Sequence, residues 1–188
     1  MNSAPVLDLI TSKAGASVCL NIGGRETRIP GFLNVDLQDL PTTDILDDIS
    51  TLHTIKDATI SEIYASHVLE HFIWTKTLNV LRTWRRVLKK GGVAYMAVPD
   101  WDVIVRLYQS DGLSPYLIEL IYGEPDKQET FGNHYNVFNY ARLGEHLTEA
   151  GFEDVERIQA MPYDINDCSK LRENRGNRLI SLMVKATA

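Results

Sequence analysis

Cysteine is scarce in this chain, whose 188 residues include only Cys19 and Cys168. Two cysteines so far apart give neither a disulfide framework nor the close spacing of zinc-binding cysteines. Long hydrophobic runs are also absent, since none approaches the ~20 apolar residues that cross a bilayer. The first residues lack a basic leader and carry Asp8 within their apolar part, unlike a signal peptide. We therefore expect a cytoplasmic protein with no membrane partner.

Positive charge is in deficit as well. The chain has 19 Lys and Arg against 25 Asp and Glu, a formal net charge of −6. An acidic chain is poorly suited to non-specific binding of nucleic acids, so we expect no nucleic-acid partner. The length and the 44% share of hydrophobic residues suit a single domain, residues 1–188, with a full core.

Short apolar runs rich in β-branched residues predict strands that are buried on both faces, as in a parallel sheet. They lie at residues 18–22, 32–37, 60–65 and 93–98, with a weaker candidate at 44–49 and two late ones at 152–159 and 179–185. Between residues 72 and 90 the apolar positions recur at three- and four-residue steps, which predicts a helix that Gly91 and Gly92 end. A second helix is expected at 142–151. This order predicts an α/β fold with a mostly parallel, Rossmann-like sheet and a C-terminal antiparallel hairpin.

Paired glycines end the first predicted strand. Gly23 and Gly24 can bring backbone N–H groups close to an anionic ligand because no Cβ intervenes. Asp36, at the end of the next strand, is placed to accept both hydroxyls of a ribose. Only seven residues separate Gly24 from Phe32, whereas a parallel crossover takes about a dozen, and Pro30 opposes a helix there. We therefore expect the helix after the first strand to be reduced or missing.

Six segments follow one another as LNIGG (20–24), GFLNVD (31–36), DILDDIS (44–50), EIYASHVLEHF (62–72), VLRTWRRVLKKGGVAYMAVPD (80–100) and HLTEAGFEDVERI (146–158). In this order they resemble the class I S-adenosylmethionine-dependent methyltransferases, in particular the group often called type 11. The resemblance covers roughly residues 17–185, and its most specific part is 80–100. The glycine motif of that family is reduced here, because Arg25 follows the glycine pair.

The resemblance implies methyl transfer from S-adenosylmethionine to a small-molecule acceptor. It places the cofactor against Asn21, Gly23, Gly24, Asp36, Leu37, Asp48 and Ser66. It also implies three catalytic candidates on the acceptor side, where the fourth strand ends and where the chain returns from an insertion: His67, His134 and Tyr135. The insertion, residues 101–139, contains predicted helices at 102–108 and 113–123 and is expected to cap the acceptor.

The segment HVLEH at residues 67–71 also fits the ligand pattern of inverted zinc peptidases. Those enzymes need both histidines and the glutamate on one face of a continuous helix. Here the segment directly follows an apolar strand and lies at a strand-to-helix junction. We therefore expect no metal.

Two other classes of protein remain open. A non-catalytic scaffold or binding protein with this fold would account for the reduced glycine motif. An NAD-dependent oxidoreductase would use Asp36 in the same way, but it would need a G-x-G-x-x-G fingerprint that the chain lacks. A homodimer through the apolar face of Leu117, Ile118 and Ile121 is also left open.

Overall fold

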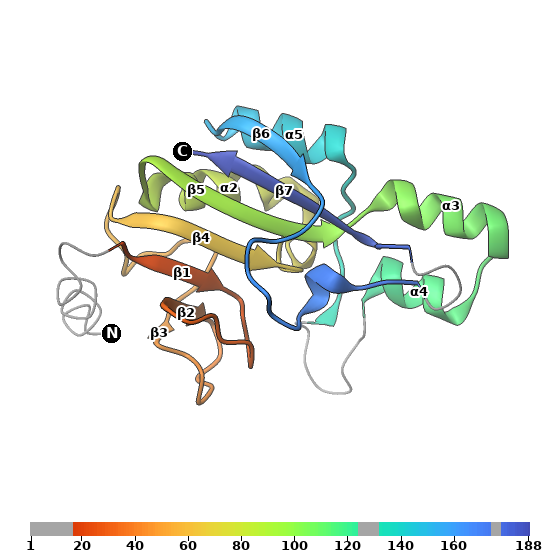
Figure 1. Cartoon of the computed structure of the whole chain (residues 1–188), viewed down its shortest axis with the longest axis horizontal. Helices are drawn as coiled ribbons and strands as arrows, with labels where there is room; N and C mark the ends of the chain where they lie inside the picture. The colour runs from red at the N-terminus through yellow and green to blue at the C-terminus, as the bar shows by residue number, and fades with distance from the viewer. Residues whose placement is uncertain (1–16, 124–131, 174–177) are drawn as a thin grey trace.

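The structure is a computed structural model that describes residues 17–123, 132–173 and 178–188. Within these residues the chain forms a seven-stranded sheet in the order β3-β2-β1-β4-β5-β7-β6 (Figure 1). The strands are β1 (Cys19–Ile22), β2 (Phe32–Asp36), β3 (Ile45–Leu46), β4 (Ile60–Ser66), β5 (Leu88–Pro99), β6 (Glu153–Ile158) and β7 (Ser181–Thr187). Strands β1 to β5 are parallel, and β7 lies antiparallel between β5 and β6. The predicted mostly parallel sheet with a C-terminal antiparallel hairpin is confirmed.

The helices are α2 (Thr77–Val87), α3 (Trp101–Asp111), α4 (Pro115–Tyr122) and α5 (Tyr140–Glu149), with 3-10 turns η1 (Leu69–His71), η2 (Trp74–Lys76) and η4 (Cys168–Lys170). Asp100, Ser114 and Asn139 each accept a backbone N–H from the first turn of α3, α4 and α5, respectively, and such caps favour a helix start. The two helices predicted within the insertion are thus present as α3 and α4. Residues 124–131 of the predicted cap lie outside the described residues.

One face of the sheet is covered by α2 and α5, which pack on the largest hydrophobic core (Figure 1). The buried residues of α2 recur at three- and four-residue steps, because that spacing keeps them on one side of a helix; they are Thr77, Val80, Leu81, Trp84 and Val87. Trp84 is fully buried and donates its indole N–H to the carbonyl of Ile49 over 2.8 Å. This bond ties α2 to the segment that follows β3.

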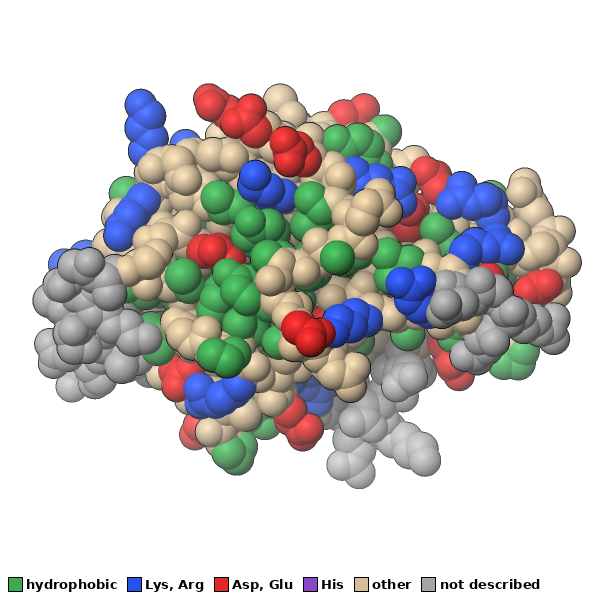
Figure 2. Space-filling model, viewed as in Figure 1, with side chains coloured by type: hydrophobic (Ala, Val, Ile, Leu, Met, Phe, Trp, Pro, Cys, Tyr) green, Lys and Arg blue, Asp and Glu red, His purple; other side chains and the backbone are tan. Residues whose placement is uncertain are grey.

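The opposite face is covered differently, because among the described residues no α-helix lies over β1, β2 and β4 there. The connection between β6 and β7 crosses this face instead (Figure 1). Tyr163 packs edge-on against Phe32, with ring centroids 5.0 Å apart. Two hydrogen bonds of 2.6 Å also join this connection to β4. Tyr64 of β4 donates to Asp167, and Tyr163 of the connection donates to Glu62 of β4. Figure 2 shows this face, with hydrophobic side chains gathered over β1 and β4.

Residues 23–31, between β1 and β2, form only turns and irregular backbone. The side-chain amide of Asn21 donates to the carbonyl of Thr27 over 3.0 Å and to the side chain of Asn34 over 3.1 Å. These bonds fold the short segment back onto the sheet. The helix that usually follows the first strand is missing, as the sequence predicted.

The end of α2 differs from the prediction. The helix ends at Val87, four residues before Gly91, and Leu88 is already extended and paired with β4. Gly91 donates its N–H to the carbonyl of Ala188 over 2.7 Å, and Gly92 accepts the N–H of Ala188 over 2.8 Å. Hydrogen bonds to the last residue of the chain therefore draw the glycine pair into the sheet, and the local helical pattern contains no information about such a contact.

Candidate active site

The turn after β1 has little room for side chains. Gly23 has φ +64°, and a Cβ added there would lie 3.0 Å from a methyl group of Val68. Its backbone N–H is already bonded to the carbonyl of Val35 over 2.9 Å. A Cβ on Gly24 would collide with the side-chain amide of Asn21. The glycine pair is therefore required by close packing against the side chain of Asn21 in β1 and against the loop that follows β4.

Asp36 lies at the end of β2 and is 7% exposed. One carboxylate oxygen accepts the N–H of Arg25 over 3.2 Å and the other accepts the N–H of Gln38 over 3.0 Å. These bonds fix the carboxylate between the glycine turn and the end of β2. Each oxygen of a carboxylate can accept more than one hydrogen bond, so both keep capacity for ribose hydroxyls.

The other predicted cofactor residues on this side lie at the same sheet edge. Leu37 follows Asp36 and is 51% exposed. The pairing of Asp36 with Leu46 brings the end of β3 alongside. Asp48, two residues further, accepts the backbone N–H and the hydroxyl of Ser50 over 2.8 and 2.6 Å and so holds a turn. Both amide hydrogens of Asn21 are used inside the protein, so the structure gives this side chain a supporting role.

The loop after β4 begins at His67, which has φ +54°. Its Nε2 lies 2.8 Å from the hydroxyl of Ser181, which itself donates to the carbonyl of Cys168 over 2.8 Å. Because a carbonyl can only accept, the Ser181 hydroxyl accepts from His67, and Nε2 carries a hydrogen. Nδ1 lies 3.2 Å from Oε1 of Glu70. Both ring nitrogens of His67 are thus engaged by the protein.

Glu70 is 1% exposed, and sequence reasoning did not include it among the candidate site residues. Burial would raise the pKa of its carboxyl group, but the neighbouring His67 and His71 oppose this, and the net direction is a lowered pKa. Glu70 is therefore held as a carboxylate. The HVLEH segment did contain a signal for it, because a charged residue between two histidines directly after a buried strand is unusual in a core.

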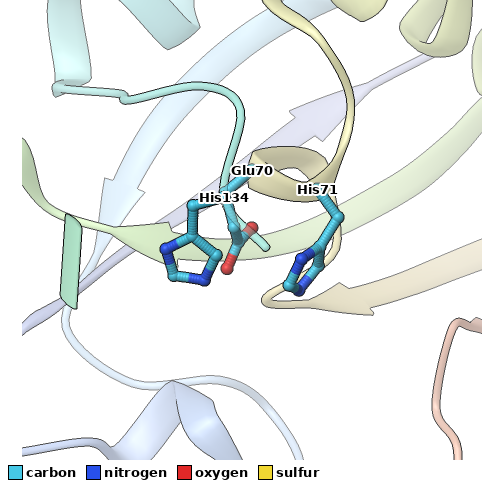
Figure 3. A group of neighbouring side chains, drawn as sticks. All are labelled: Glu70, His71 and His134. Carbon is cyan, nitrogen blue, oxygen red and sulfur yellow. The ribbon is translucent and has the colours of Figure 1, made fainter. Parts of the chain in front are cut away.

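The segment that returns from the insertion packs on this loop. Tyr135 donates its N–H to the carbonyl of Glu70 over 2.8 Å, and Nδ1 of His71 lies 2.9 Å from the carbonyl of Asn133. The rings of His71 and His134 approach within 5.1 Å, centroid to centroid. Figure 3 shows Glu70, His71 and His134 as neighbours. Burial lowers the pKa of His134, which favours a neutral imidazole near pH 7.

A pocket of about 580 Å³ lies beside this segment. It is lined by Trp74, Trp101, Ile121, Tyr122, His134, Tyr135, Asn136, Val137, Asn139 and Arg142. Its aromatic side chains include Trp74 and Tyr122, which are 59% and 64% exposed. The sequence predicted only His134 and Tyr135 here, because the other lining residues come from separate elements that only the fold brings together.

Comparison with known proteins finds a methyltransferase domain and several methyltransferases of similar fold. Residues 28–96 match the family described as a methyltransferase domain, and no curated protein matches the chain. A SAM-dependent methyltransferase from Archaeoglobus fulgidus has a similar structure, with a TM-score of 0.57 and 15% identity over 99% of this chain and 92% of that one. One from Methanosarcina mazei has a TM-score of 0.57 and 18% identity over 90% of this chain and 91% of that one.

A third solved structure includes bound small molecules. It is the 1,6-didemethyltoxoflavin-N1-methyltransferase of Burkholderia thailandensis, with bound 1,6-didemethyltoxoflavin and S-adenosylhomocysteine. It is 16% identical over 98% of this chain and 77% of that one, with a TM-score of 0.56. At these identities the structures show the shared fold alone, and the domain match covers residues 28–96.

The match of residues 28–96 to a methyltransferase domain and the shared fold both agree with the predicted class I S-adenosylmethionine-dependent methyltransferase. The predicted Rossmann-like fold is confirmed, and the domain match supports the predictions of a methyltransferase activity and of S-adenosylmethionine as the cofactor. In the described part of the chain, no helix is long and apolar enough to cross a membrane.

Proposed function

We propose that the protein transfers the methyl group of S-adenosylmethionine to a small-molecule acceptor that binds in the aromatic pocket beside residues 132–139. One observation carries this proposal: the loop after β4 contacts both halves of the site. Val68 packs against Gly23 in the glycine turn, and the carbonyl of Glu70 accepts the N–H of Tyr135. The loop thus connects the expected cofactor edge to the pocket.

The pocket has the size and lining of a small-molecule site. Its volume falls within the range of about 300–1,000 Å³ that is usual for such sites. Trp74, Trp101 and Tyr122 offer flat apolar surfaces, and Asn136 and Arg142 offer polar groups. We expect a planar or aromatic acceptor with a polar substituent. The Burkholderia thailandensis enzyme, whose bound 1,6-didemethyltoxoflavin is named in its structure, is consistent with an acceptor of that size.

We assign the cofactor to the edge formed by the ends of β1, β2 and β4. Asp36 accepts the ribose hydroxyls, Leu37 packs against adenine, and Asp48 lies at the adenine side. Gly23 and Gly24 allow close approach of the cofactor, and Ser66 lies where β4 ends. Within the predicted cap, the described residues 101–123 and 132–139 form the cover over the acceptor as part of a single domain.

The reaction does not need a covalent intermediate with the protein. The methyl group of a sulfonium ion is already activated, so the enzyme contributes mainly in-line orientation and exclusion of water. A base is needed only where the acceptor must lose a proton. Among the three catalytic candidates, His67 has both nitrogens engaged, whereas His134 and Tyr135 lie on the pocket wall. We therefore favour His134 and Tyr135 as the residues that contact the acceptor.

A screen of small aromatic acceptors, with release of S-adenosylhomocysteine as the signal, tests the proposal. A Tyr122→Ala variant should raise KM for any acceptor found, while the affinity for S-adenosylhomocysteine stays unchanged. The matched control is Tyr108→Ala, since Tyr108 is 56% exposed on α3 and outside the pocket lining. Equal activity of both variants, or activity only on protein or nucleic acid, would contradict the proposal. A homodimer, cytoplasmic location and the absence of nucleic-acid or membrane partners stay predictions.

A further inference from the structure

Three side chains with metal-binding groups meet where η1 contacts the segment that returns from the insertion. Glu70 and His71 belong to η1, and His134 belongs to that segment. One potential ligand atom from each residue lies within 4.8 Å of the other two. Figure 3 shows the carboxylate of Glu70 between the two imidazole rings.

Hydrogen bonds to the backbone fix the proton on each imidazole. Nδ1 of His71 lies 2.9 Å from the carbonyl of Asn133, and Nδ1 of His134 lies 3.1 Å from the carbonyl of Leu120. A carbonyl oxygen only accepts, so both Nδ1 atoms carry the hydrogen. In the neutral rings Nε2 therefore keeps its lone pair. Metal-binding histidines usually have this arrangement, with one nitrogen donating to a carbonyl or carboxylate and the other free to bind.

The carboxylate of Glu70 supplies an independent observation. Both oxygens are buried, and Oε2 has no hydrogen-bond partner among the described residues. Oε1 is held by the contact of 3.2 Å to Nδ1 of His67, whose other nitrogen bonds to Ser181. A buried carboxylate oxygen without a donor is costly. A cation bound to Oε2 would remove that cost. His67 would then orient the carboxylate through its contact with the other oxygen, Oε1.

We propose that Glu70, His71 and His134 bind a divalent transition-metal ion through the carboxylate and the two Nε2 atoms. Two imidazoles and one carboxylate form a donor set typical of Zn²⁺ and its neighbours Mn²⁺, Fe²⁺ and Co²⁺, and they leave coordination positions open. Ligand atoms about 2.1 Å from one ion can be at most about 4.2 Å apart. The cluster therefore needs only a small side-chain adjustment to close on an ion.

This proposal differs from the sequence-based expectation of no metal. That expectation considered only HVLEH, whose two histidines do not share a helical face at the end of a strand. In the proposed site His67 is not a ligand, and the third ligand is His134, from a segment more than sixty residues later. Local spacing could not reveal it.

An ion at this position would lie beside the acceptor pocket and could act on the acceptor. His134 lines the acceptor pocket, so the open coordination positions of the metal would lie at the pocket wall. A bound ion lowers the pKa of a coordinated water or hydroxyl. An acceptor hydroxyl at this point would lose its proton more easily and become a better nucleophile. Binding of the ion itself does not depend on the identity of the acceptor.

Cobalt titration of untagged protein, freed of metal with a chelator and dialysed, tests the site. We expect one equivalent of Co²⁺ to bind and to produce visible absorption bands. Glu70→Gln and His134→Ala should each weaken binding by about 100-fold or more, since even the loss of an outer partner of a metal ligand costs 10- to 100-fold. His53→Ala is the control, because the His53 side chain is 60% exposed and pairs with Asp47 outside the cluster. Binding well below one equivalent, or equal binding in all variants, would overturn the proposal.

Melting temperatures separate metal binding from folding. Co²⁺ should raise the melting temperature of the wild type and of His53→Ala, because a ligand that binds the native state stabilises it. His134 is only half-buried, so His134→Ala should fold and should still bind S-adenosylhomocysteine, but its melting temperature should not respond to Co²⁺. If Co²⁺ stabilises His134→Ala as much as the wild type, the ion binds elsewhere and the proposal is wrong.

Discussion

The Nδ1 atom of His67 lies 3.2 Å from Oε1 of Glu70 in a site where the carboxylate is almost completely buried. Burial alone would raise the pKa of Glu70, but the neighbouring His67 and His71 outweigh it, and the net pKa is lowered. The contact therefore favours the ionised carboxylate, and its contribution to stability depends on pH.

We expect stability in the presence of a chelator to fall on acidification. The pKa of Glu70 is lowered in the folded state, so its contribution is fully present above the unfolded pKa of about 4.3 and is lost as the pH falls through the folded value. Urea unfolding between pH 7 and pH 3 measures this. Glu70→Gln should show a shallower dependence over that range than the wild type, and parallel curves would contradict the assignment.

Asp36→Ala should weaken binding of S-adenosylhomocysteine by about 1–3 kcal/mol, since it removes a charged acceptor for the ribose hydroxyls. Calorimetry on wild type and variant gives the difference, and NAD should give no heat with either. Asp39→Ala, an exposed acidic residue of the same loop, is the control for net charge. An unchanged dissociation constant in Asp36→Ala would remove this residue from the site, and no binding to folded wild type would favour the scaffold alternative.

Gly23→Ala should destabilise the protein by about 1–2 kcal/mol, because alanine is strained at φ +64° and its Cβ would press on Val68. Gly144→Ala is the matched control. Gly144 lies inside α5 and an added Cβ would meet nothing within 4 Å, so alanine should stabilise by about 0.5–1 kcal/mol. Thermal unfolding gives both changes, and effects of the same sign would show that the glycine turn is not constrained as described.

Tyr64→Phe should cost about 1.5–3 kcal/mol, because it removes a hydrogen bond to the carboxylate of Asp167 at a buried position. In the Tyr64→Phe variant, the rate of proteolysis should increase relative to the wild type, and this increase should be largest in the connection between β6 and β7. Tyr108→Phe, at an exposed position on α3, should leave stability unchanged. If the two variants unfold alike, the bond to Asp167 does not hold the connection in place.

The sequence predicted most of the sheet, because each strand is a short apolar run whose pattern is local. It placed the end of α2 wrongly at Gly91, since the hydrogen bonds of that residue go to Ala188. The pocket shows the same limit. His134 and Tyr135 were found through resemblance, whereas Trp74 and Tyr122 come from different elements and have no shared local signal. Glu70 was visible in its motif, but its burial and the missing donor at its Oε2, among the described residues, are properties of the folded chain.

The connection between β6 and β7, which covers β1, β2 and β4, also affects how the chain folds while it is being synthesised. The hydrogen bond between Tyr64 and Asp167 joins residues 103 positions apart. The ring contact between Phe32 and Tyr163 is of similarly long range in the sequence. While the chain is being made, the first strands therefore leave the ribosome long before the segment that shields them. Contacts of such long range slow folding and leave sheet surface open to association. We expect the nascent chain to be vulnerable to aggregation until the connection between β6 and β7 has emerged.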